Sequence, residues 1–212
     1  MWVMLPAEIA RRDPPRDDPG VEGNRRLTAL TAVVLLLLLF VEGATLLALG
    51  PLLPVHVFVG MLLLPPIALK LASVGYRFVR YYTGAGAYRE AGPPPRLLRA
   101  LGPLVVLSTL ALFGTGVALV VAGPGTGGLK GLHKLSFIVW AAAMAIHVLW
   151  HLEKLPGAVA AEWRRRRPHG GAGKRALALG LSLAVGLVLA AATAHLATPF
   201  RHHGGDRIER DH

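Results

Sequence analysis

Five long apolar runs constrain the fold of this chain more than any other feature of its sequence. Each can cross a hydrocarbon layer of about 30 Å as a helix, whereas an isolated strand would leave its backbone groups without partners in lipid. The sequence therefore predicts an all-α protein, a multi-pass transmembrane bundle of about five helices that forms one membrane domain over residues 27–198. The expected spans are roughly residues 27–49, 54–76, 100–122, 131–152 and 176–198.

Composition supports a membrane protein and excludes several other classes. Hydrophobic residues make up 53% of the chain, charged residues 17%, and the mean hydropathy is +0.50, which is more apolar than a soluble core of this size requires. The formal charge of +11 comes from short arginine clusters without interleaved aromatic residues, so we expect no nucleic-acid partner. The absence of cysteine excludes disulfides, thiolate metal sites, iron–sulfur clusters and covalent c-type haem attachment. Histidine remains as the candidate metal ligand.

Two arginine-rich segments set the expected orientation. Residues 77–99 and 153–175 carry many basic side chains, whereas the connections at 50–53 and 123–130 are short and nearly uncharged. Basic loops tend to stay in the cytoplasm, and short uncharged turns face outward. We therefore expect a cytoplasmic amino terminus in a cell membrane, the inner membrane of a bacterium. The second and fourth helices then both run from outside to inside.

The regions that flank and join the apolar runs carry further predictions. Residues 1–26 predict a disordered cytoplasmic tail, and residues 199–212 predict a polar external tail. The first apolar run is too long for the apolar part of a signal peptide, so we expect it to remain as the first span. Pro51 and Pro54 predict a tight turn between the first two helices, and the Pro65–Pro66 pair predicts a bend or local break in the second.

Ionisable residues inside apolar spans are costly and usually functional, so the histidines within the spans are the first candidates for a site. His133 and His147 lie 14 residues apart, which places them on one face of the fourth helix about 21 Å apart along its axis. His56 and Lys70 repeat this spacing on the second helix. Because both helices run inward, we expect an outer tier of His56 with His133, and an inner tier of Lys70 with His147.

Two imidazoles that face each other inside a helix bundle are the usual axial ligands of a low-spin b-type haem. Gly60, one turn from His56, would let the flat macrocycle approach the helix backbone. Lys130 and Lys134 lie at the outer edge, within reach of haem propionates. The outer tier therefore predicts a haem b site.

Alternatives stay open for the outer tier. His56 and His133 can be interfacial residues that are satisfied by water or a backbone carbonyl. His195, near the outer end of the fifth helix, can replace His133 as the partner of His56. We expect Glu42 to be half-exposed near the outer turn, and a proton acceptor linked to quinone chemistry would look the same.

The inner tier also has several interpretations. Lys70 can be a substitute ligand, a propionate partner, or a lysine whose stem lies in lipid while its ammonium group reaches the interface, and we favour the last. His147 and His151 lie four residues apart and can form a metal pair or a proton relay instead of ligating haem. Glu153 is the nearest carboxylate in the sequence, and we expect His151 to reach the headgroups.

The chain resembles the di-haem membrane cytochrome b superfamily, which includes the gamma subunits of formate dehydrogenases and the cytochrome subunits of nickel–iron hydrogenases. The resemblance covers about half of the chain and rests on His56 with Gly60, on Leu132-His133-Lys134, and on Ile146-His147-Val148-Leu149-Trp150-His151. It implies that His56 and His133 hold an outer haem and that His147 ligates an inner one. The family's fourth histidine has no counterpart in the first helix, so we expect one haem b and treat a second as an alternative.

These patterns predict a membrane electron carrier that passes electrons between a partner protein and membrane quinone. Such a protein is at most an electron-transfer subunit of an oxidoreductase complex, with lipid, quinone and a redox subunit as its partners. The competing hypothesis is a haem-free membrane protein that scaffolds a complex or carries a small substrate. The sequence shows no internal repeat, which argues against a transporter.

Overall fold

The structure, a computed structural model, describes residues 19–84, 86–90, 96–123, 125–152 and 171–197. All regular secondary structure within these ranges is helical, which confirms the all-α class. The predicted external tail and most of the predicted amino-terminal tail lie outside the described residues, and so do His202, His203 and His212.

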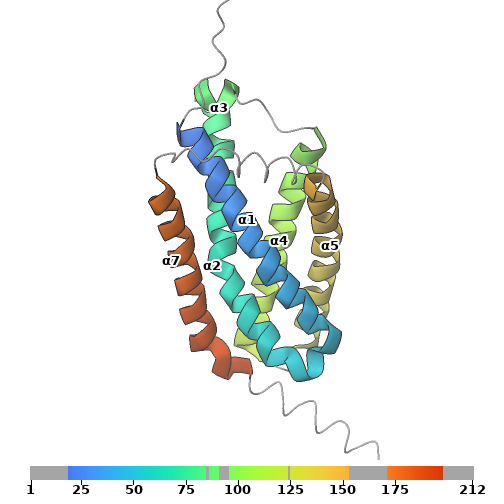
Figure 1. The fold of residues 1–212 in the computed structure, drawn as a ribbon. Coiled ribbons are helices and arrows are strands. Elements are labelled where there is room, and N and C mark those ends of the chain that lie inside the picture. The colour runs from blue at the N-terminus through green and yellow to red at the C-terminus, as the bar shows by residue number, and fades with distance from the viewer. Residues whose placement is uncertain (1–18, 85, 91–95, 124, 153–170, 198–212) are drawn as a thin grey trace, which may run out of the picture.

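The long helices alternate in direction along the chain (Figure 1). As a result α2 and α5, the predicted second and fourth helices, run the same way, as the two tiers require. α7 is the predicted fifth helix. The elements are α1 (Pro19–Thr45), η1 (Leu46–Ala48), α2 (Leu49–Tyr82), α3 (Gly86–Glu90), α4 (Arg96–Ala122), α5 (Gly127–Leu152), α7 (Ala172–Thr193) and η2 (Ala194–Ala197).

α2 is the central helix of the bundle and packs against both α1 and α7 (Figure 1). α4 packs against α5. The group of α1, α2 and α7 meets the α4–α5 pair where α2 contacts α4. At the centre Leu35 of α1 packs with Val59 and Leu63 of α2, and Phe113 of α4 joins this cluster. The core therefore connects the α1–α2 hairpin to the α4–α5 hairpin.

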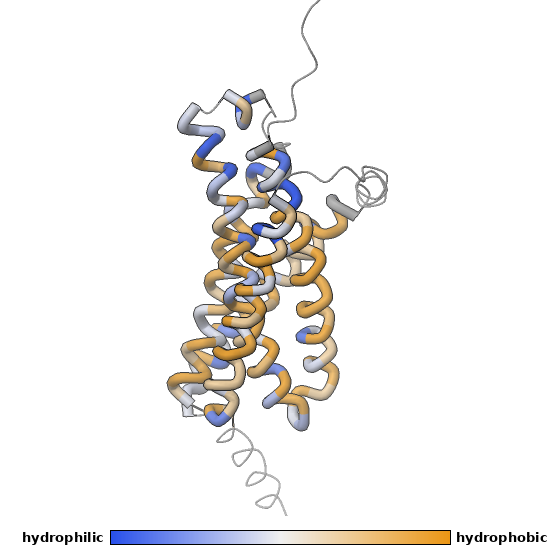
Figure 2. The backbone as a smooth tube through the Cα atoms, turned by 60° about the vertical axis from the view of Figure 1, so that its left-hand side comes forward, coloured by the Kyte–Doolittle hydropathy of each residue, from blue (hydrophilic) through white to orange (hydrophobic). Residues whose placement is uncertain are grey.

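Four helical stretches are long and apolar enough to cross a membrane: Gly20–Tyr82, Arg99–Ala122, Gly127–Trp150 and Ala172–Ala197. The first includes α1, η1 and α2, which fold back on each other. Many large apolar side chains face outward along these helices, among them Phe40 at 79% and Leu47 at 89% exposure. Figure 2 shows that hydrophobic residues predominate along most of the bundle. A surface of this kind is stable in lipid and not in water, so the protein is a membrane protein.

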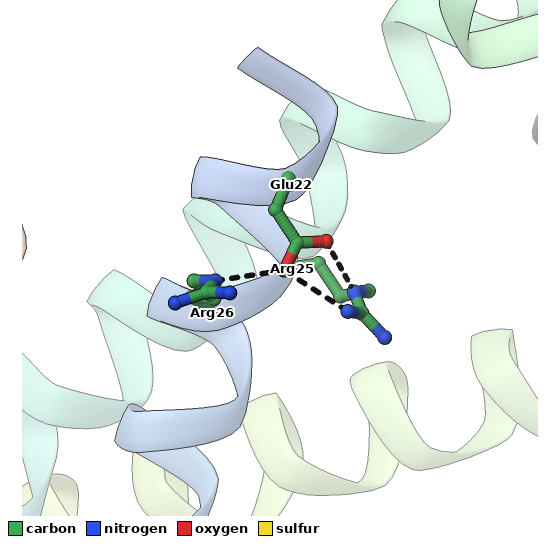
Figure 3. Close-up of polar contacts among 3 residues, drawn as sticks. All are labelled: Glu22, Arg25 and Arg26. Carbon is green, nitrogen blue, oxygen red and sulfur yellow. Dashed lines mark hydrogen bonds and ion pairs between the residues drawn. The ribbon is translucent and has the colours of Figure 1, made fainter. Parts of the chain in front are cut away.

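The helix α1 begins earlier than the sequence indicates, at Pro19 instead of Leu27. Proline suits the first helical position, and Glu22 in the first turn faces the positive end of the helix dipole. Figure 3 shows how Glu22 also accepts hydrogen bonds from Arg25 at 2.8 and 3.0 Å and from Arg26 at 2.7 Å. Local ion pairs therefore extend the helix into residues 19–26, where composition alone predicted disorder.

The first turn of the chain also lies earlier than predicted. The chain reverses at residues 46–48, where Ala48 leaves the helical region with φ −145° and ψ 59°. Pro51 and Pro54 lie near the start of α2. Pro51 is in the first helical turn, where a backbone N–H would have no intrahelical partner, so the missing N–H of proline costs no hydrogen bond. A prediction of a turn at the prolines was therefore wrong by a few residues, although the hairpin itself forms.

The Pro65–Pro66 pair lies inside α2 without breaking it. Since Pro66 has no N–H, the carbonyl of Leu62 loses its usual helical donor. Gly186 of α7 covers this carbonyl so closely that an added Cβ atom would lie 2.5 Å from the Leu62 oxygen. The missing hydrogen bond and the close approach of the two helices thus occur at the same point.

Candidate functional site

His56 and two residues of α1 form a polar cluster beside the first turn of the bundle. The Nδ1 atom of His56 lies 2.9 Å from Thr45 Oγ1 and 3.1 Å from Glu42 Oε1. Thr45 is buried, and the side chains of His56 and Glu42 are only 21% and 16% exposed. The expectation of a half-exposed Glu42 was therefore wrong, because the carboxyl group turns inward to the imidazole.

His133 near the start of α5 has a similar arrangement. Its Nδ1 atom lies 3.0 Å from Thr115 Oγ1, which belongs to the neighbouring helix α4. Thr115 Oγ1 also donates to the carbonyl oxygens of Ala111 at 2.7 Å and Leu112 at 2.9 Å. Each candidate histidine is thus oriented by a threonine on the adjacent helix of its own hairpin.

The two threonine hydroxyls determine which ring nitrogen carries the proton. A hydroxyl has one proton, and each of these hydroxyls gives it to a backbone carbonyl, Thr45 to Glu42 and Thr115 to Ala111 and Leu112. Each oxygen can therefore only accept from Nδ1–H of its histidine. Both imidazoles then keep a lone pair on Nε2, the form in which neutral histidine binds a metal.

His56 and His133 lie at the same end of the bundle. α2 and α5 both begin at this end (Figure 1). The structure thus brings the two residues of the predicted outer tier into one region.

Two glycines make room for these side chains. A Cβ atom on Gly60 would lie 3.4 Å from Glu42 Oε1, so the space expected for a macrocycle holds this carboxyl group. A Cβ atom on Gly116 of α4 would lie 3.2 Å from Cε1 of His133, closer than side chains normally pack. Gly116 therefore sets how closely the His133 ring approaches α4.

Lys70 lies in the second half of α2, 14 residues beyond His56, and turns toward α1. Its Nζ atom donates a 2.7 Å hydrogen bond to the Thr28 carbonyl. Ser73 is buried beside it, 2.7 Å from Thr28 Oγ1, and accepts a 3.1 Å hydrogen bond from Asn24 through its carbonyl. The lipid-facing interpretation of Lys70 was therefore wrong, because its ammonium group binds a helix backbone instead of reaching the headgroups.

The remaining predicted site residues have fewer described contacts. His147 is half-buried on α5, on the face that carries His133, Trp140 and the buried Ala143. Trp140 Nε1 donates to Thr109 of α4 at 3.1 Å, so this face packs on α4. His195 in η2 is exposed, and the side chain of His151 lies outside the described residues. Lys130 and Lys134 are exposed near the start of α5.

Thr45, Thr115 and Gly116 were not among the residues predicted from the sequence. A positional signal exists for Thr115, because antiparallel neighbours pair residues that are equally distant from their turn. Thr115 and His133 lie symmetrically about residue 124, between the end of α4 and the start of α5. Thr45 and His56 are not symmetric about the turn at residues 46–48, so the same reasoning would not have found Thr45.

Searches with protein-family models, among curated proteins and among solved structures found no match to this chain. Within the described residues, no group of three or more His, Cys, Asp or Glu side chains is arranged to hold a metal ion. The candidate site therefore consists of two oriented imidazoles, each from a different hairpin, with Glu42 beside one of them.

Proposed function

We propose that this chain is a membrane-bound b-type cytochrome, similar to the di-haem membrane cytochrome b superfamily, that transfers electrons between a partner protein and the quinone pool. One observation carries the proposal. Two histidines on helices that run the same way each use Nδ1 for a hydrogen bond to a neighbouring threonine, which leaves Nε2 for a ligand. This is the arrangement of an axial histidine, whose second nitrogen is held by an outer hydrogen bond.

The proposal includes five crossings with the amino terminus in the cytoplasm. α1 and α2 form separate arms of one hairpin, so we count each as a span. Basic side chains gather where α1 and α7 begin and α2 ends, the more hydrophilic end of the bundle in Figure 2. Under the positive-inside rule this end faces the cytoplasm of a bacterial inner membrane. The residues concerned include Arg25, Arg26, Arg77, Arg80, Lys174 and Arg175.

The residues of the outer tier fit haem b. His56 and His133 would hold its iron, and the bound group would supply a one-electron couple. Thr45 and Thr115 keep both histidines in the tautomer that leaves Nε2 unprotonated. Both histidines are partly buried, and the exposed Lys130 and Lys134 offer positive charge to propionates.

The inner tier supports a second haem less well. Lys70 already donates to the Thr28 carbonyl on α1, so its contact lies with α1 and not with His147. We therefore propose one haem in the outer tier, with His147 as the candidate ligand for any second haem. The pyridine haemochrome of the purified protein gives the stoichiometry and decides between one and two.

Optical spectra of the purified protein test the proposal directly. The protein should show the Soret band and the reduced alpha band of a bis-histidine haem b. His56→Ala and His133→Ala should each abolish the same haem, while His147→Ala should leave it in place. His195→Ala is the matched control, because His195 is an exposed histidine at the same end of the bundle.

A colourless preparation from haem-replete cells would contradict the proposal. It would favour the competing function, a haem-free membrane protein that scaffolds a complex or carries a small substrate. The polar contacts of Lys70, Thr28, Ser73 and Asn24 between α1 and α2 are the observation in its favour, since polar side chains inside a membrane bundle often line a substrate path. Loss of all haem on His147→Ala would instead show that the proposed tiers are wrong.

A further inference from the structure

Glu42 is a largely buried acidic residue that the proposed electron transfer does not use. Its Oε1 atom lies 3.1 Å from His56 Nδ1, and its Oε2 atom is buried without a hydrogen-bond partner among the described residues. An acidic residue inside a membrane helix is energetically costly and therefore rare. Such a residue normally has a local function, and the contact with His56 shows where that function lies.

Gly60 on α2 provides the space that Glu42 occupies. A Cβ atom at this position would contact Glu42 Oε1 at 3.4 Å, so alanine would just fit and a branched side chain would displace the carboxyl group. Glu42 is therefore held between the His56 ring and the bare backbone at Gly60. Thr45, one turn away on the same helix, contacts the same nitrogen of His56 at 2.9 Å.

We infer that Glu42 is a positioning residue that, together with Thr45, accepts the Nδ1–H of His56 and so fixes both the tautomer and the ring plane that present Nε2. Thr45 cannot donate to Nδ1, because its hydroxyl proton already goes to the Glu42 carbonyl. His133 is oriented by the Thr115 hydroxyl instead, so the two proposed axial ligands have different outer contacts. What Nε2 binds rests on the proposed function, whereas the hydrogen bond to Nδ1 does not.

The rate of haem transfer to an excess of apomyoglobin measures how firmly His56 is held. Loss of an outer hydrogen bond typically weakens metal binding by 10- to 100-fold, so Glu42→Leu should accelerate haem loss by about that factor. Glu42→Gln should stay near the unsubstituted rate, because its amide oxygen can still accept from Nδ1–H. Glu22→Leu is the control, since Glu22 lies at the opposite end of the same helix.

Two results would overturn the inference: unchanged haem loss in Glu42→Leu, or equally fast loss in Glu42→Gln, which would indicate that charge and not hydrogen bonding matters. If Glu42→Leu does not fold, Gly60→Val takes its place, because it displaces the carboxyl group without removing it. The same acceleration is then expected.

A second measurement separates this inference from the proposed function. The ¹⁵N resonances of labelled histidine in the purified protein, reduced if it contains haem, report which ring nitrogen is protonated. We expect Nδ1–H at His56 in the unsubstituted protein and a loss of this preference in the Glu42→Leu Thr45→Val double variant. A colourless protein with this result would refute the cytochrome and keep the positioning role, while equal tautomer populations in both proteins would refute the positioning role.

Discussion

The contact between Gly186 of α7 and the Leu62 carbonyl of α2 allows a quantitative test of how this bundle packs. In Gly186→Ala the new Cβ atom would lie 2.5 Å from the Leu62 oxygen, 3.1 Å from Leu62 Cδ1 and 3.3 Å from the Leu62 carbonyl carbon. A carbon atom normally approaches a carbonyl oxygen no closer than about 3.3 Å. The helices must therefore separate by roughly 0.8 Å at this point, since two backbones meet here and neither can rotate away.

A separation of this size weakens the contacts along the interface. A radial gap of 0.5 to 1 Å already loses a quarter to a half of each dispersion contact. Overpacking of this kind costs about 1 to 3 kcal/mol, so we expect Gly186→Ala to lower the free energy of unfolding by that amount. Small residues at helix contacts are what lets membrane helices approach, and the buried Ala190 continues this contact one turn further along α7.

Reversible unfolding in mixed micelles with increasing dodecyl sulfate is the suitable assay, monitored by circular dichroism. Gly180→Ala is the matched control, because Gly180 lies on the same helix with nothing within 4 Å of an added Cβ atom. That substitution should be neutral or should stabilise by roughly 0.5 to 1 kcal/mol through helix propensity. If both variants unfold alike, the close α2–α7 contact at the Leu62 carbonyl does not exist in the membrane.

Three further substitutions test other contacts. Gly116→Ala should displace the His133 ring by a few tenths of an ångström, because the added Cβ atom would lie 3.2 Å from Cε1. A shifted Soret band would report this displacement, and an unchanged band would contradict the prediction. Lys70→Met should cost about 1 kcal/mol through the lost bond to α1 and leave the haem spectrum unchanged, whereas a changed spectrum would make Lys70 a ligand. Trp140→Phe should cost about 1 kcal/mol by removing the bond to Thr109, measurable by the same unfolding titration and absent in Trp140→Phe when Thr109→Val is already present.

The all-α class and the approximate positions of the helices could be predicted because length and apolarity suffice for them. The ends of the helices could not. Composition placed Glu22 in a tail, but its pairing with Arg25 and Arg26 adds turns to α1 that no apolar pattern records. Proline was also a misleading guide to where the chain reverses between α1 and α2. Pro51 is tolerated in the first helical turn of α2 as well as it would be in a loop.

The candidate site was predictable in part for a different reason. A spacing of 14 residues determines that His56 and Lys70 share a face of α2, and the structure agrees with this. It does not determine which neighbour that face contacts, because this depends on the rotation of the helix about its axis. Both side chains turn to α1, the hairpin partner, and His133 and Trp140 likewise turn to α4.

Hairpin partners also explain why each histidine has its own orienting hydroxyl. The Nδ1 side of each ring is held within one hairpin, by Thr45 for His56 and by Thr115 for His133. In an imidazole Nε2 lies across the ring from the Nδ1 contact, so it is directed away from the helix that holds Nδ1. A ligand that binds both Nε2 atoms would therefore join the two hairpins, which contact each other through α2 and α4 and through the apolar cluster around Leu63. Binding would then stabilise the contact between the two hairpins, and this links the chemistry of the proposed site to the assembly of the fold.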